Sequence, residues 1–74
     1  MIWERKLPTE EGYYWFYGYQ FRGEKKPELH VMEVWKVSNG IIHIINGAFA
    51  WAQEMGEFAV TRLERPELPN LEKK

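Results

Sequence analysis

The segment GYYWFYGYQF, residues Gly12 to Phe21, carries seven aromatic side chains in ten positions. Aromatic residues are enriched in β-strands, where successive side chains point to opposite faces of the sheet. The segment therefore predicts a strand over about residues 12–22, with aromatic rings on both of its faces. In a chain of 74 residues, one such strand supplies much of the apolar side-chain surface that a core can bury.

The two faces of this predicted strand differ in polarity. One face holds Tyr13, Trp15, Tyr17, Tyr19 and Phe21, and the other holds Tyr14, Phe16, Gly18, Gln20 and Arg22. The second set becomes polar toward its end, which indicates the solvent side. We therefore expect the first set to form the core, since each large ring buries ~150–250 Å².

Turn residues divide the remainder of the chain into further strands. The pairs Asn39-Gly40 and Asn46-Gly47 are each flanked by apolar residues and predict two-residue type I′ hairpin turns. The expected later strands cover about 29–38, 41–45, 48–54 and 57–64. The segment 48–54 is ambiguous, because it also fits a helix with Asn46 as its N-cap and Gly56 after its end.

These elements predict an all-β fold. We expect a five-stranded antiparallel meander that curls into a small SH3-like half-open barrel, formed by a single domain over residues 1–66. Two prolines in RPELPNLEKK disfavour a helix, so residues 67–74 are expected to form an extended tail.

A binding surface is predicted on the second strand and its neighbour. Met32 and Val34 share one face of that strand, whereas Glu33 shares the other with Val31 and Trp35. If Glu33 points to solvent, the two apolar neighbours on its face are exposed with it, and such a patch is typical of an interface. The predicted binding residues are Tyr14, Phe16, Arg22, Val31, Glu33 and Trp35.

The composition is a poor match to most active sites. The chain has no cysteine or aspartate, and Ser38 is its only serine. His30 and His43 have no spacing typical of a metal site, and Glu33 beside Trp35 is an isolated candidate for acid–base chemistry. We therefore predict no enzymatic activity, no metal and no cofactor.

Charge bears on the partner and on the compartment. The net charge of −1 argues against general binding of polyanions, although rings beside basic residues keep single-stranded nucleic acid or a nucleotide as the alternative ligand. The opening MIWERK lacks the apolar core of a signal peptide, and no apolar run is long enough to span a membrane. A cytoplasmic protein without a membrane partner is expected.

Three segments carry a resemblance: LPTEEGYYWF at 7–16, VMEVWKV at 31–37 and RPELP at 65–69. Together they resemble short uncharacterised proteins of phages and prophages, although AFAWAQEMGEF at 48–58 departs from that pattern. The resemblance implies a phage accessory protein that binds a protein partner, with inhibition of a host system as one version. A homodimer through the same apolar face is a further possibility.

Overall fold

The computed structural model describes residues 2–64 and residue 69, and these residues form a β fold without an α-helix. The predicted tail therefore lies outside the described residues, apart from Pro69. The elements are β1 (Gly12–Gly18), β2 (Glu28–Val37), β3 (Gly40–Ile45), β4 (Ala48–Phe49), the short 3₁₀ turn η1 (Ala52–Glu54) and β5 (Phe58–Leu63).

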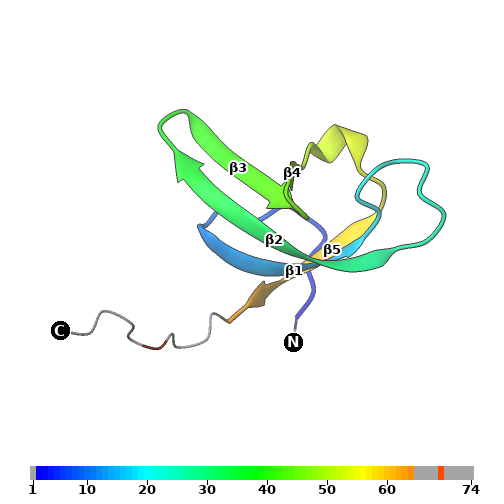
Figure 1. The fold of residues 1–74 in the computed structure, drawn as a ribbon, viewed down its shortest axis with the longest axis horizontal. Coiled ribbons are helices and arrows are strands. Elements are labelled where there is room, and N and C mark those ends of the chain that lie inside the picture. Colours follow the sequence, from blue (N-terminus) through cyan, green and yellow to red (C-terminus); the bar gives the residue numbers. More distant parts are fainter. Residues whose placement is uncertain (1, 65–68, 70–74) are drawn as a thin grey trace.

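All five strands belong to one antiparallel sheet with the order β4-β3-β2-β1-β5 (Figure 1). The first four strands form the predicted meander, and β5 returns to pair with β1. Because β4 and β5 stand at opposite edges, the sheet is not closed. We call residues 2–11, which precede β1, the lead-in chain. It adds one antiparallel bridge to the β5 edge, where Glu4 and Val60 exchange two backbone hydrogen bonds of 2.7 Å.

The two predicted hairpin turns have different outcomes. Asn46 and Gly47 link β3 to β4 with φ values of 53° and 81°, so both have the positive φ that a type I′ turn requires. The other turn was placed wrongly. Val37 pairs with Gly40, so the two linking residues are Ser38 and Asn39, and Gly40 already belongs to β3.

The segment 48–54 is a strand only at its start, and it is not the α-helix of the alternative. It begins as the two-residue strand β4 and ends as η1, with Trp51 extended between them. The backbone N–H of Ala50 still donates to the carbonyl of His43, after which the chain leaves the sheet edge. It then crosses one face of the sheet toward β5, which brings Met55 into the core.

The core lies on the face of β1 that had been predicted to be exposed. Tyr14 and Phe16 are buried, whereas Tyr17 on the opposite face is 47% exposed and Trp15 is half-buried. We call this buried side of the sheet the inner face. Its core residues on the strands are Tyr14, Phe16, Met32, Val34, Ile45 and Val60. Met32 and Val34 share one face as predicted, and that face is the buried one, whereas the prediction for the two faces of β1 was wrong.

The inversion has a physical reason in the chain that covers the sheet. Leu7, Ala50 and Met55 all pack on the inner face from outside the paired segments. The polar residues that seemed to mark the solvent side follow Gly18, where β1 ends. Gln20 is itself buried, and its side-chain amide is satisfied by donating to the carbonyl of Ile45 at 3.0 Å.

Gly18 lies close against the backbone at the start of β5. A Cβ at this position would lie 2.4 Å from the carbonyl oxygen of Glu57 and 2.6 Å from the Cα of Phe58. Real Cβ atoms do not approach backbone that closely, so only glycine fits here without moving β5.

We expect Phe16→Ala to unfold or nearly unfold the domain. Removing a fully buried phenylalanine costs about 3–5 kcal/mol, and a domain of this size has little more than that in total. Trp15→Ala should cost clearly less, because the Trp15 ring is only half-buried. Thermal melts of the two variants measure the difference, and equal losses would contradict the placement of the core.

Gly18→Ala and Gly47→Ala separate crowding from backbone strain. Both glycines have positive φ, but a Cβ at Gly47 would meet nothing within 4 Å. We expect Gly47→Ala to destabilise by about 1 kcal/mol through strain alone, and Gly18→Ala to cost considerably more. Denaturant unfolding gives both values, and similar losses would show that β5 can shift away from β1.

Candidate functional site

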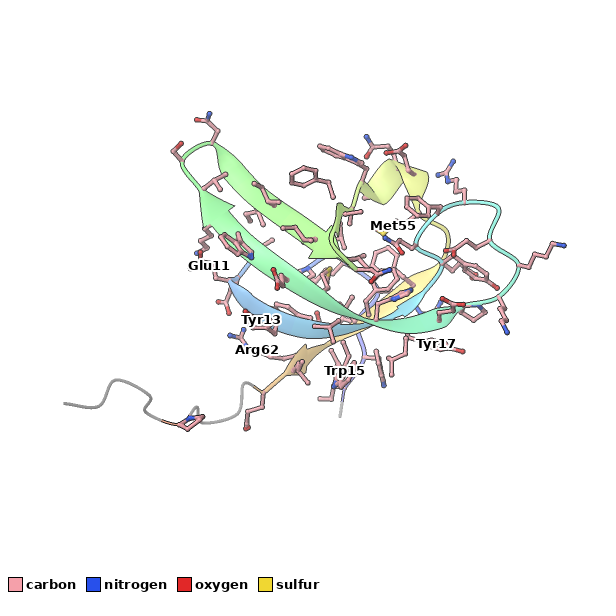
Figure 2. All side chains as sticks on the ribbon, in the orientation of Figure 1. Glu11, Tyr13, Trp15, Tyr17, Met55 and Arg62 are labelled. Carbon is pink, nitrogen blue, oxygen red and sulfur yellow. The ribbon has the colours of Figure 1, made fainter. Side chains whose placement is uncertain are left out.

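The side of the sheet opposite the core carries the exposed rings, and we call it the outer face. The pairing of β1, β2, β3 and β5 places these residues on it: Tyr13, Trp15, Tyr17, Leu29, Val31, Glu33, Trp35, Val37, Ile42, Ile44, Ala59, Thr61 and Leu63. Figure 2 shows Trp15 and Tyr17 on the opposite side of β1 from the core residue Met55. Glu33 is the only charged side chain among those that the described strands place on this face.

The structure brings together half of the predicted binding residues. Val31, Glu33 and Trp35 lie on the outer face, with Val31 and Trp35 exposed as predicted. Tyr14 and Phe16 do not lie there, because they are buried in the core on the other side.

Arg22 does not border the outer face. It lies in the loop between β1 and β2, where its backbone N–H donates to the carbonyl of Glu54 and its Nε donates to the carbonyl of Met55. These bonds attach Arg22 to the segment that covers the inner face, at the end of the molecule where Figure 1 shows η1 beside this loop. Its predicted place at the edge of the patch was therefore wrong.

The alternate rings of β1 take the place of Tyr14 and Phe16. Trp15 lies directly opposite Val31, Tyr13 lies opposite Glu33, and Tyr17 lies opposite Leu29. The sequence did contain a signal for this arrangement, since Glu33 marks the solvent side of β2. Which rings of β1 share that side depends on the register between the two strands.

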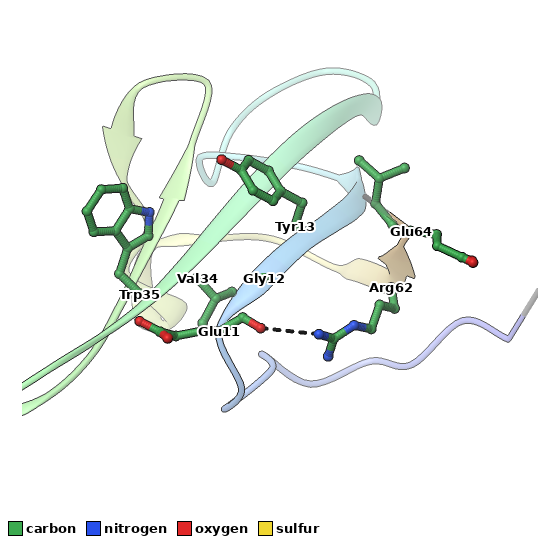
Figure 3. A pocket seen from close by; sticks show the side chains of 8 residues that line it. Glu11, Gly12, Tyr13, Val34, Trp35, Arg62 and Glu64 are labelled. Atoms are coloured by element: carbon green, nitrogen blue, oxygen red, sulfur yellow. Dashed lines mark hydrogen bonds between the residues drawn. The ribbon is translucent and has the colours of Figure 1, made fainter. Parts of the chain in front are cut away.

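At one end of the outer face, the sheet surface is hollowed between Tyr13 and Trp35 (Figure 3). This open hollow has a volume of about 710 Å³. Its lining residues are Glu11, Gly12, Tyr13, Val34, Trp35, Arg62, Leu63 and Glu64. Two large rings and several charged groups therefore converge there, whereas the rest of the outer face is nearly all apolar.

Two carboxylates are fixed around the Trp35 side of the hollow. The indole N–H of Trp35 donates to Oε2 of Glu33 at 3.3 Å. Oε2 of Glu11 accepts the backbone N–H of Lys36 at 3.0 Å, which holds the lead-in chain against β2. Trp35 is 53% exposed, so this bonding orients its ring without covering it.

Arg62 forms the other wall of the hollow, and its guanidinium is held by several partners. It donates to the hydroxyl of Tyr14 at 3.1 Å, to a carboxylate oxygen of Glu10 at 3.4 Å and to the carbonyl of Glu11 at 3.3 Å. The last of these is the dashed line in Figure 3. The guanidinium also lies over the Tyr14 ring, 5.4 Å from its centroid. Arg62 thereby connects β5, β1 and the lead-in chain.

The two histidines have local partners. His30 lies 3.7 Å from a carboxylate oxygen of Glu28, and Nε2 of His43 lies 2.6 Å from the carbonyl of Pro8. The part of the chain that the structure describes contains no group of three histidine, cysteine or acidic side chains placed to hold a metal ion. Among the same residues, no helix is long and apolar enough to cross a membrane.

Comparisons of the chain with protein-family models, with curated proteins and with solved structures find no match. The function is therefore argued from the geometry of the outer face and its hollow.

Tyr14→Phe tests the network that supports the hollow. The Tyr14 hydroxyl donates to the carbonyl of Glu10 at 2.9 Å and accepts from Arg62, so its loss removes two hydrogen bonds worth about 0.5–1.5 kcal/mol each. We expect the free energy of unfolding to fall by about 1–3 kcal/mol, measured by urea denaturation. Tyr17→Phe on the exposed surface is the control, and an equal effect there would exclude the network as the cause.

Proposed function

We propose that this is a non-catalytic binding protein whose outer face docks on a protein partner. The observation that carries the proposal is the row of rings Tyr13, Trp15 and Tyr17 beside Val31 and Trp35, all on the face turned away from the core. Contiguous apolar surface of this kind usually marks an interface in a soluble protein.

The composition of the face also supports docking on a protein. Tyrosine and tryptophan are the residue types that most often carry the binding energy of an interface, because they bury large areas with few rotatable bonds. The charged residues gather at one end, around the hollow, where they add specificity more than affinity. An apolar patch bordered by charged residues is typical of protein interfaces.

The distribution of charge disfavours the alternative of a single-stranded nucleic acid or a nucleotide. The exposed ring of Trp35 is bonded to Glu33 and stands near Glu11, and carboxylates repel phosphates. The basic residues Lys25 and Lys26 lie in the loop at the far end of β1.

Several further expectations remain part of the proposal: a phage or prophage context, inhibition of a host system, a cytoplasmic location and an SH3-like character of the open sheet.

The test combines a photo-crosslinking residue with matched tryptophan variants. A crosslinker at position 17 on the outer face, and a second at position 51 in the covering segment, are used in lysate of the producing cells. The protein captured from position 17 is then purified and titrated against the chain. We expect Trp35→Ala to weaken this binding by about 30-fold or more, as at an interface hot spot. Trp51→Ala is the control, because Trp51 is 55% exposed but lies outside the strands, where it lines a separate hollow with Leu7 and Ala50 of the segments that cover the inner face.

Normal binding by Trp35→Ala, or an equal loss in Trp51→Ala, would contradict docking through the outer face. Sedimentation of the purified chain identifies a different occupant. If the chain sediments as a dimer and Trp35→Ala sediments as a monomer, the partner is a second copy. Circular dichroism of each variant is recorded first, because the comparison requires folded protein.

A further inference from the structure

We infer that the hollow between Tyr13 and Trp35 receives an arginine side chain of the docking partner. This inference rests on the proposed function and specifies the chemistry of the partner at one end of the outer face. The arrangement of the rings, the excess of carboxylates, and the distance to the lysines of the loop after β1 support it independently.

The two rings are placed to hold a flat cation. Tyr13 lies opposite Glu33, and Trp35 is two residues farther along β2, so the two rings are diagonal neighbours on the same face. Side chains in that relation are separated by about 7–8 Å at the backbone and can both touch one bound group. The face of an indole is the best aromatic surface for a cation, and a guanidinium stacks flat on it.

Carboxylates outnumber cations around the rings. Glu11 and Glu64 line the hollow, and Glu33 is bonded to the edge of the Trp35 ring. Arg62 is the one basic residue among the described residues of the lining, and it is already engaged by Glu10, by the Glu11 carbonyl and by Tyr14. Lys36 follows Trp35, but its side chain alternates to the opposite face of β2. Among the residues that the structure describes, three carboxylates therefore stand around the hollow against the one guanidinium of Arg62, and this excess of negative charge beside aromatic faces complements a positively charged side chain.

The basic residues of the loop after β1 are too far away to cancel this charge. The hollow lies at the Gly12 end of β1, and Lys25 and Lys26 follow its Gly18 end. Seven strand residues span roughly 20 Å at 3.3 Å each, which is about twice the distance over which physiological salt screens exposed charges. A cation is therefore attracted to the hollow although the net charge of the whole chain is only −1.

The geometry favours arginine over lysine. A guanidinium can stack on Trp35 with its plane while its N–H groups bond the second carboxylate oxygens of Glu33 and Glu11. A lysine ammonium is a compact and strongly hydrated charge, so it gains less from the ring faces in an open hollow.

The experiment uses three capped tripeptides, Gly-Arg-Gly, Gly-Lys-Gly and the citrulline analogue, which has the shape of arginine without its charge. Each is titrated into ¹⁵N-labelled chain, and the indole N–H signal of Trp35 is followed by NMR. We expect a saturable shift with the arginine peptide in the millimolar range, and about tenfold weaker binding of the citrulline peptide. The indole signal of Trp51 should not move.

Variants connect the shift to the hollow. Trp35→Leu keeps an apolar side chain but removes the ring, so the backbone signals around Tyr13 should no longer respond to the arginine peptide. Glu33→Gln and Glu11→Gln should each weaken binding severalfold, and together they should remove the difference between arginine and citrulline. Trp51→Leu is the matched control and should bind as the unaltered chain does.

Equal binding of the arginine and citrulline peptides would overturn the inference, as would the absence of any shift at Trp35. Lysine binding as tightly as arginine would overturn the assignment to a guanidinium. None of these results bears on the crosslinking test, so docking through the outer face can stand without the arginine site. Conversely, binding of the arginine peptide together with normal partner binding by Trp35→Ala would retain the cation site and reject the docking proposal.

Discussion

The structure depends on the pairing of β1 with neighbours on both of its sides. β2 and β5 both bond to it, so the register of this one strand decides which rings face the core and which face outward. Tyr14 and Phe16 then meet Met32 and Val60 across the two ladders on the inner face. Because successive side chains of a strand point to opposite faces, the same register places Tyr13, Trp15 and Tyr17 on the outer face.

The aromatic richness of β1 therefore serves two purposes that strand geometry makes inseparable. A small domain needs large side chains to bury enough surface, and β1 supplies two of them to the inner face. The alternate rings Tyr13, Trp15 and Tyr17 are not among the core residues, and they remain at least partly exposed. The functional proposals rest on this second set, together with the residues of β2 that lie beside it.

Much of the sheet could be predicted from local patterns. The spans of β2 and β3, the turn at Asn46-Gly47 and the inward direction of Met32 and Val34 all follow from alternation and turn chemistry. The direction of β1 could not be predicted in this way. Period two tells which side chains share a face, but which face is buried depends on the segments that cover it, here Leu7 and Met55.

The candidate site was predictable to a similar degree. Val31, Glu33 and Trp35 were assigned to one exposed face from β2 alone, because a glutamate between apolar residues indicates the solvent side. The rings opposite them required the register between β1 and β2. The hollow required in addition the positions of Glu11 in the lead-in chain and Glu64 after β5, which line one hollow with Trp35 only in the folded chain.

The return of β5 to β1 has a consequence for the order in which the chain can fold. The hairpins joining β2, β3 and β4 close over two-residue links and can form quickly, whereas β1 and β5 come from opposite ends of the sequence. During synthesis, the early strands emerge before β5 exists, so β1 has an open edge and the core lacks Val60. The cooperative step must therefore wait for β5, and until then the nascent chain presents its most aromatic strand unpaired on one side.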